Sequence, residues 1–383
     1  MSFAAVVIGN YVYIDGGEIT QLENGSISNQ GRKTINSTLS LDLTKSWITT
    51  DVTFKRIPKT GPIKSNVVLW KDSARNAFYS WGGNWPFELN KTKAELWRFN
   101  ADGSGGGRWG LETPSNPELF NSLISAANIA YTTVNNTGYA LGGRATKLTT
   151  VDRKDGDGNQ AIPGMLTYNF DTREWTNETA STGFSPFPSI ASASAQYVPT
   201  FGPSGLVFVL GGHLLDVDRD FPYANSPAQP FDNLTFFDPV AKKTYFQKAT
   251  GDIPPSPRAD FCLEGLQNPE GGYEMFLFGG VNRANSSTKY HDAYILSLPG
   301  FILSIGGMRT TDIEKDKAPQ GLLLFDMAEL RWMDVYDTTI GAYERHKNIT
   351  AWYASGSMDK MQWSSEEVKG LFVKQEDGGG MCL

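Results

Sequence analysis

The stretch LVFVLGG, residues 206–212, decides the fold, because five apolar residues run directly into two glycines. Valine, leucine and phenylalanine suit β-strands packed against neighbours. Glycine lacks a Cβ atom, so it reaches positive φ angles and lets another backbone approach closely. The stretch therefore predicts a short strand that ends where the interior of the protein is crowded.

The same pattern recurs along the chain. Glycine doublets end the stretches YVYIDGG, FYSWGG, GYALGG, LVFVLGG, MFLFGG and ILSIGG, and their first glycines are Gly16, Gly82, Gly142, Gly211, Gly279 and Gly306. The successive spacings are 66, 60, 69, 68 and 27 residues, so five doublets share a period and the sixth breaks it. A period of this size indicates an architecture of repeated units.

Each unit carries the signals of four short antiparallel strands. One strand precedes the doublet strand, and a second apolar segment after it leads through a polar turn to an aromatic residue that opens the next strand. These aromatic residues are Trp47, Trp109, Trp175, Tyr245 and Trp332. Four-stranded sheets repeated around an axis form a β-propeller. A pair of β-sandwiches with coincidental glycine turns is the alternative.

The glycine doublets and the later aromatic residue resemble the Kelch repeat. Four longer stretches, IPPSPRADFCLEGL, AYILSLPGF, APQGLLLFDMAELRWMDVYD and WYASGSMDKMQWSSEEVKGLF, are similar to segments of fungal cell-surface Kelch proteins, and the resemblance covers residues 3–373. It implies a galactose-oxidase-like propeller, usually preceded by a signal peptide and followed by a membrane span. The resemblance thus implies an architecture and a cell-surface or extracellular location, without implying a reaction.

We expect an all-β, Kelch-type propeller of six blades, with the fifth and sixth incomplete, in residues 1–338. The expected blades lie near residues 3–57, 63–113, 122–180, 187–250, 254–301 and 302–338. A C-terminal extension, residues 339–373, should contain a short helix begun by the capping-box pattern of Ser364 and Glu367. Residues 374–383 have the composition of a disordered tail.

The last two units meet without room for a full blade. In SLPGFILSIGG, residues 297–307, a third-strand segment runs directly into a doublet strand. The spacing of 27 residues is 39 shorter than the first spacing of 66, about the length of two strands with their loops. The doublet strand is either the outer strand of the fifth blade or, as we favour, the second strand of a sixth blade without an inner strand.

Composition excludes several classes of function. The chain has 34 Lys and Arg against 41 Asp and Glu, a net charge of −7, which argues against a nucleic-acid surface. No apolar run approaches the roughly 20 residues that cross a bilayer, and the first residues do not have the pattern of a signal peptide. The expectation is a chain without a transmembrane segment, signal peptide or anchor.

Because consecutive strands run in opposite directions, the loops that follow the glycine doublets should all lie on one face of the propeller. The loop residues Glu18, Trp85, Arg144, His213, Arg283 and Arg309 form a candidate ligand-binding face there. A ring of polar and aromatic groups on a rigid scaffold is a plausible binding surface. The alternative is that each is an ordinary solvated loop residue, since a fold by itself does not imply a function.

The loop GGHLLDVDRD offers the weak metal candidates His213, Asp216, Asp218 and Asp220. Imidazole and carboxylate groups bind divalent metals, but this spacing fixes no single coordination geometry, and a solvated acidic loop is the favoured interpretation. The chain has three histidines, far apart in the repeat, against the two histidines, two tyrosines and Tyr-Cys crosslink of the galactose oxidase copper site. No cofactor and no catalytic set are expected.

Eight N-x-S/T sequons suggest a glycosylated ectodomain: Asn24, Asn36, Asn90, Asn135, Asn177, Asn233, Asn285 and Asn348. The expected function is a non-catalytic binding module for a protein or a cell-wall glycan. Two alternatives stay open, a metal-dependent Kelch enzyme with a site near His213 and an intracellular Kelch scaffold.

Overall fold

The computed structural model describes most of the chain. The described residues are 3–19, 22–23, 26–27, 33–86, 91–154, 157–178, 184, 187–216, 226–267, 272–282, 288–296, 301–305, 322–341, 343–344, 346–355 and 361–372.

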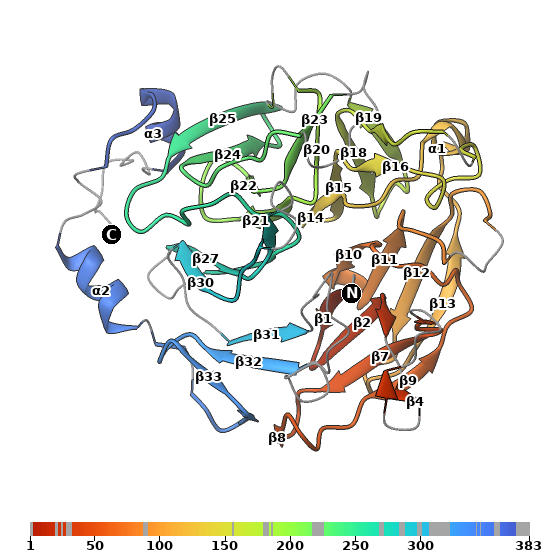
Figure 1. Ribbon diagram of the computed structural model, residues 1–383, viewed down its shortest axis with the longest axis horizontal. Coiled ribbons are helices and arrows are strands. Elements are labelled where there is room, and N and C mark those ends of the chain that lie inside the picture. Colours follow the sequence, from red (N-terminus) through yellow and green to blue (C-terminus); the bar gives the residue numbers. More distant parts are fainter. Residues whose placement is uncertain are drawn as a thin grey trace.

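Five antiparallel sheets stand around a common axis as the blades of a propeller (Figure 1). Blades 1 to 4 have four strands each and blade 5 has three, in chain order from the axis outward. Blade 1 contains β1 (Phe3–Ile8), β2 (Tyr11–Gly16), β7 (Ser37–Asp42) and β9 (Lys55–Pro58); blade 2 contains β10 (Val68–Asp72), β11 (Ala77–Trp81), β12 (Leu96–Ala101) and β13 (Gly107–Glu112). Blade 3 contains β14 (Ala130–Val134), β15 (Thr137–Leu141), β18 (Met165–Asn169) and β19 (Trp175–Glu178); blade 4 contains β21 (Ser194–Val198), β22 (Leu206–Leu210), β24 (Asn233–Asp238) and β25 (Lys243–Lys248); blade 5 contains β26 (Cys262–Gln267), β27 (Tyr273–Phe278) and β30 (Ala293–Leu296).

The hydrophobic core lies in the seams between neighbouring blades. Trp70 of blade 2 and Trp175 of blade 3 are buried with ring centroids 5.6 Å apart, and Tyr13 of blade 1 lies 5.1 Å from Phe99 of blade 2. Blade 2 therefore buries both of its faces against other blades, because the side chains of a strand alternate between the two sides. This arrangement confirms the propeller and excludes a pair of sandwiches.

The glycine doublets lie where one blade meets the next. In five doublets the first glycine has φ between 58° and 72°. A Cβ atom on Gly142 would lie 2.1 Å from the carbonyl oxygen of Ile190 in the next blade, and the amide of Gly143 donates to that oxygen at 2.7 Å. The doublet thus lets two backbones approach and bond directly. The sixth doublet, Gly306 and Gly307, lies outside the described residues.

A further three-stranded sheet stands between blade 5 and blade 1, formed by β31 (Phe301–Ile305), β32 (Leu322–Asp326) and β33 (Arg331–Met333). Five blades are confirmed, and whether this sheet counts as a sixth blade stays a prediction. Phe301–Ile305 pairs with β32, as we favoured, and not with blade 5. In the part of the chain that the structure describes, nothing inside β31 corresponds to an inner strand.

A two-stranded ladder links blade 1 to the segment after this sheet. β8 (Trp47–Ile48) pairs with β34 (Val335–Tyr336), and the rings of Trp47 and Tyr336 stack at 5.0 Å. The prediction that Trp47 opens the outer strand of blade 1 is wrong, since β9 fills that place. We call this ladder the closing clasp, because it joins the two ends of the ring.

The C-terminal extension contains two helices, α2 (Lys347–Ala354) and α3 (Glu366–Phe372), and α1 (Pro117–Ser122) adds one unexpected turn between blades 2 and 3. The capping prediction is wrong by one residue, because the hydroxyl of Ser365 accepts from the amide of Val368 at 3.1 Å. Glu367 instead accepts from Lys243 of blade 4 at 2.6 Å. α3 therefore docks on blade 4. The expected tail, residues 374–383, lies outside the described residues.

Candidate functional site

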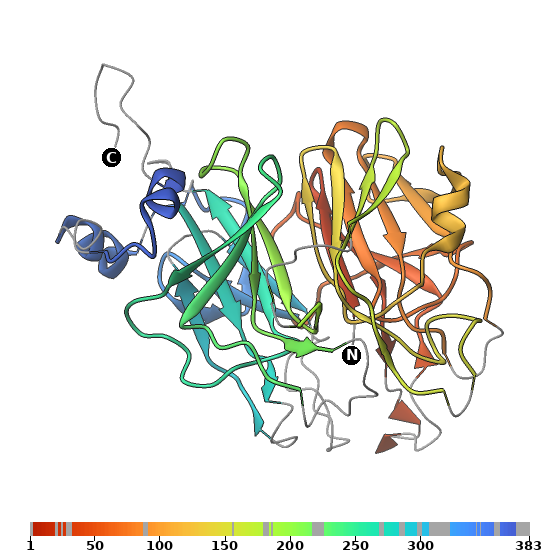
Figure 2. The same cartoon turned by 90° about the horizontal axis from the view of Figure 1, so that it is seen from above.

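Short hairpins extend the loops between the second and third strands, and all these loops leave the same face of the ring. Figure 2 shows the blades edge-on. The hairpins are β3 (Glu18–Ile19) with β6 (Lys33–Thr34), β4 (Leu22–Glu23) with β5 (Ser26–Ile27), β16 (Arg144–Ala145) with β17 (Gln160–Ala161), and β28 (Val281–Asn282) with β29 (Thr288–Lys289). In blade 4, β23 (His213–Leu215) pairs with β20 (Ser189–Ala191), which precedes that blade's inner strand. We call this face the loop face.

Lys91 joins the loops of blades 2 and 3. Its ammonium donates to the backbone carbonyls of Lys147 at 2.5 Å, Arg153 at 3.1 Å and Thr150 at 3.2 Å. One side chain thereby satisfies three carbonyls of a loop that is 56 to 62 residues away in sequence. Hydrogen bonds from a charged donor are stronger than neutral ones, so this bridge fixes the two loops relative to each other.

The loops joined by Lys91 form the best-defined surface of the loop face. We call it the loop platform and define it as residues 83–86, 91–95, 143–154 and 157–164. Its exposed side chains carry both signs of charge and hydroxyl groups: Thr92, Lys93, Lys147, Asp152, Lys154 and Asp157. Such a mixed surface offers donors and acceptors to a polar partner, and it is not the one-sign surface that binds nucleic acid.

Trp85 lies at the edge of the platform but does not offer a ring to solvent. It is 6% exposed, and the ammonium of Lys64 lies 4.6 Å from its ring centroid. Burial lowers the pKa of Lys64 to about 8, against the opposing effect of Glu95. Desolvation disfavours the charged amine, and the ring face compensates for part of the lost water. The structure therefore assigns Trp85 a packing contact.

Three other candidates of the loop face are held in backbone ladders. Glu18 pairs with Thr34, Arg144 with Ala161, and His213 with Ala191. Glu18 and Arg144 are half-buried, whereas His213 is 1% exposed, with its Nδ1 atom 3.3 Å from the carbonyl of Ser226. The remaining two candidates, Arg283 and Arg309, lie outside the described residues.

The metal candidates are separated by their burial. His213 is in the interior, and Asp216 is half-buried at the end of the same strand. Asp218 and Asp220 lie outside the described residues. Where the chain is described, no three His, Cys, Asp or Glu side chains come together in a way that could hold a metal ion.

Two ion pairs near the glycine doublets are not indicated by the sequence, one buried on both sides and one between a buried arginine and an exposed aspartate. Lys59 meets Asp15 at 2.6 Å, with both side chains at most 2% exposed, and Thr38 donates to the same carboxylate at 2.9 Å. Arg258 is fully buried and pairs with Asp292 at 2.6 Å. A basic residue shortly before an inner strand is the one signal that the sequence offers, and it does not reveal the partner.

Arg258 also forms a ring contact on each of two tyrosines. Its guanidinium carbon lies 4.1 Å from the ring centroid of Tyr290 and 5.0 Å from that of Tyr294. Its Nη1 atom donates to the carbonyl of Gly279 at 3.1 Å. Arg258 also donates to both carboxylate oxygens of Asp292, at 2.6 and 2.9 Å, and these two hydrogen bonds lower the pKa of Asp292. The ion pair between Arg258 and Asp292 is therefore a structural contact beside Gly279, in the last glycine doublet that the structure describes.

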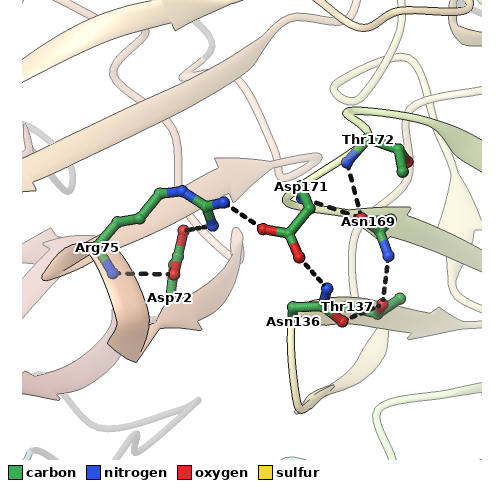
Figure 3. Close-up of polar contacts among 7 residues, drawn as sticks. All are labelled: Asp72, Arg75, Asn136, Thr137, Asn169, Asp171 and Thr172. Carbon is green, nitrogen blue, oxygen red and sulfur yellow. Dashed lines mark hydrogen bonds and ion pairs between the residues drawn. The ribbon is translucent and has the colours of Figure 1, made fainter.

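A polar network joins blades 2 and 3 on the face opposite the loops (Figure 3). Arg75 is the last residue of a turn of 3₁₀ helix, η1 (Ser73–Arg75), and bridges Asp72 of blade 2 to Asp171 of blade 3. Asn136 donates to the other oxygen of Asp171. The hydrogen bonds from Arg75 and Asn136 lower the pKa of Asp171. The network is a contact between neighbouring blades.

Four of the predicted sequons have accessible acceptor residues. Asn36, Asn135, Asn177 and Asn233 are all exposed, and they come from blades 1, 3 and 4. Asn348 lies in α2. The other predicted sites, Asn24, Asn90 and Asn285, lie outside the described residues. Four accessible asparagines are compatible with N-linked glycans, which require a surface position.

A scan of the sequence against protein-family models finds no match, and a search of curated proteins finds none either. Among the described residues, no helix has the length and apolar character needed to cross a bilayer. The β-propeller is thus established by the strand arrangement, and the narrower Kelch assignment is a proposal.

Proposed function

We propose that this chain is a non-catalytic Kelch-type binding module that acts at the fungal cell surface or outside the cell. Its partner is a protein or a cell-wall glycan, bound by the loop platform. The Kelch-like repeat pattern and the eight sequons motivate the location. The four exposed described sequons support it, because glycosylation occurs in the secretory route.

The observation that carries the binding role is the bridge made by Lys91. It fixes two loops from different blades into one surface, so a partner that binds there meets groups that are already in place. Preorganisation of this kind reduces the entropy that binding costs. The exposed Lys93 and Lys147 and the exposed Asp152 supply charged donors and acceptors on that surface.

The test is a glycan array and a protein pull-down with the same biotinylated protein, followed by measurement of affinity for the captured ligand. Lys93→Glu and Lys147→Glu should weaken binding at least tenfold, since each reverses a charge on the platform. Lys91→Met should also weaken binding by releasing the loops. Lys248→Glu is the matched control, because Lys248 is exposed on the outer strand of blade 4, and it should bind normally.

An empty result on both arrays with folded protein would contradict the proposal, and so would a ligand whose affinity ignores the platform variants. Elemental analysis distinguishes the competing metal-dependent enzyme, which requires bound iron, copper or zinc in the purified protein. Occupied sequons in the protein from its native host would exclude the intracellular scaffold.

A further inference from the structure

The inner strands of blades 1 and 5 each turn one side of their residues toward the three-stranded sheet. In β1, Ala4, Val6 and Ile8 pack in the seam with blade 2, so Ala5 and Val7 point the other way. In β26, Leu263 packs toward blade 4, so Glu264 and Leu266 point the other way. Both free sides face the place between blade 5 and blade 1.

These side chains are exposed although they belong to inner strands. Val7 is 43% exposed and Leu266 is 40% exposed, while Ala5 and Glu264 are also classed as exposed. The comparable residue Leu69 of β10 packs against blade 1 and is 5% exposed. An inner strand normally covers its neighbour, and the described residues supply no such cover on these two sides.

The second strands of blades 1 and 5, in contrast, are covered by the three-stranded sheet. Phe276 of β27 is 1% exposed and lies 4.9 Å from Phe325 of β32. Ile14 of β2 is 3% exposed in a cluster with Leu322. β32 therefore fills the level of the second and third strands, and the exposure is confined to the level of the inner strand.

The innermost strand of that sheet has a free edge. β31 pairs with β32 on one side and lies nearer the axis than β32 (Figure 1). Among the described residues, no strand pairs with its other edge. Unpaired backbone donors and acceptors on a strand edge are a template for another strand. We define the acceptor edge as β31 together with the flanking residues Ala5, Val7, Glu264 and Leu266.

Glu264 adds charge to the acceptor edge. Its side chain is exposed beside the uncovered level of the inner strand, and an exposed carboxylate attracts a nearby cation. Desolvation by the surrounding protein raises the pKa of the Glu264 carboxyl group, and a backbone hydrogen bond with Gly265 and the charge of Lys71 oppose that shift. The chemistry beside β31 therefore favours a lysine or arginine on the incoming strand.

We propose that the acceptor edge binds an extended peptide segment of a partner protein, which adds antiparallel to β31 with apolar side chains against Val7 and a basic side chain against Glu264. Every inner strand of the five blades is antiparallel to its second strand, so the added strand follows the same rule. Main-chain hydrogen bonds supply affinity and the flanking side chains supply selectivity.

The chain itself provides a suitable probe peptide. In β10, Val68 and Trp70 face the following blade, whereas Leu69 faces the preceding one, as Lys71 does by alternation. A peptide with the sequence of residues 66–73, NVVLWKDS, placed inside β31, would thus present its tryptophan toward blade 1 and its lysine toward Glu264.

The experiment measures fluorescence anisotropy of this labelled peptide with the full chain. Saturable binding is expected, and it should weaken at least tenfold with Glu264→Gln or with a peptide in which glutamate replaces the lysine. A peptide with proline in place of its leucine should not bind, because proline donates no backbone hydrogen bond. Val7→Arg should block binding, whereas Leu111→Arg is the control, since Leu111 is 59% exposed on β13.

Circular dichroism and the melting temperature verify that each variant is folded. Three results would overturn the proposal: no saturation up to millimolar peptide with folded protein, equal binding of the proline peptide, or binding that ignores Val7→Arg. Sedimentation tests whether a second copy of this chain, and not a peptide of another protein, occupies the acceptor edge. A dimer that Val7→Arg dissociates would show that a second copy of this chain covers the acceptor edge.

Discussion

At the scale of the residue, the glycine doublets combine a backbone requirement with a packing requirement. Gly142 has a φ of 63°, and the nearest atom to a Cβ there is a backbone oxygen of another blade, which cannot swing aside as a flexible side chain would. Gly9 has a similar φ of 56°, but nothing lies within 4 Å of its Cβ position. Comparing Gly142 with Gly9 therefore separates the effect of the positive φ angle from the effect of close packing.

Gly142→Ala should therefore destabilise the protein far more than Gly9→Ala. We expect a loss of about 1 kcal/mol for Gly9→Ala from the positive φ alone, and of more than about 3 kcal/mol for Gly142→Ala, where steric overlap is added. Urea unfolding monitored by tryptophan fluorescence measures both. Equal losses would mean that the blades can separate at this contact without a penalty.

Burial at the same scale explains why two expected ligand-binding residues are not on an open surface. Trp85 and His213 follow glycine doublets, and a loop position predicts exposure, yet both lie in the interior. The amide of Trp85 donates to the carbonyl of Leu148 in the next blade at 2.7 Å, and His213 pairs with Ala191 in the segment that precedes the inner strand of its own blade. Burial at these positions depends on contacts with other segments of the chain, which a loop position in the sequence does not reveal.

At the scale of the element, the closing clasp joins segments separated by almost the entire chain. Besides the ladder between β8 and β34, the hydroxyl of Tyr336 donates to the carbonyl of Leu43 at 3.2 Å, and the amide of Thr49 donates to the carbonyl of Asp334 at 2.8 Å. The clasp therefore supports the contact between blade 1 and the three-stranded sheet.

Tyr336→Ala should loosen the ring at this contact. Loss of the stacked pair with Trp47 and of the hydroxyl hydrogen bond should cost about 1–2 kcal/mol. Tyr336→Phe keeps the stack and should cost less than half as much. Limited proteolysis should show earlier cleavage near the clasp in Tyr336→Ala. An alanine variant as resistant as the original protein would contradict this role for the clasp.

Helix α3 is the other element whose place depends on distant residues. Its Val368 is 3% exposed in the core cluster of blades 4 and 5, and Phe372 lies 5.4 Å from Phe236 of β24. The sequence predicts the helix from its cap and apolar residues. It does not predict the surface on which the helix docks, because blade 4 supplies that surface more than a hundred residues earlier.

At the scale of the whole molecule, several contacts between segments depend on ionised carboxylates. The pKa is lowered for Asp171 by Arg75, for Asp292 by Arg258, and for Glu367 by Lys243, in each case chiefly through a side-chain hydrogen bond. A carboxyl group with a lowered folded-state pKa stabilises the fold above its unfolded pKa and loses that contribution as the pH falls through the folded value.

Stability should therefore decline as the pH drops from about 5 toward 3, since unfolded carboxyl groups titrate near pH 4. Urea midpoints at pH 7, 5, 4 and 3 measure this decline. Arg258→Met should reduce its steepness, because Asp292 then titrates without its partner, while Lys154→Met, at an exposed residue, serves as the control. A flat profile, or equal profiles for the two variants, would contradict the linkage.

The sequence by itself determined the repeat and, apart from the outer strand of blade 1, the order of the strands in the four-stranded blades. These follow from local alternation of apolar residues and from glycines whose φ angles and missing side chains are needed at one place in every blade. Trp109 and Trp175 are buried as members of outer strands, as that pattern requires. The shortened spacing before Gly306 also predicts the missing strands, because it leaves too few residues for two strands, although the predicted junction after Phe301 falls one residue inside β31 (Phe301–Ile305).

Only the tertiary structure decided which loops become one surface and which inner strands stay uncovered. Lys91 reaches three carbonyls of another blade, and the exposed Val7 and Glu264, 257 residues apart, belong to the inner strands of the two blades that flank the three-stranded sheet. The joined loops and the uncovered inner strands both result from the closing of the ring. Closure brings together segments that are far apart in the sequence, and the repeat pattern does not indicate which of them meet. Local sequence patterns describe each blade, whereas the contacts between blades depend on the angles at which the sheets pack.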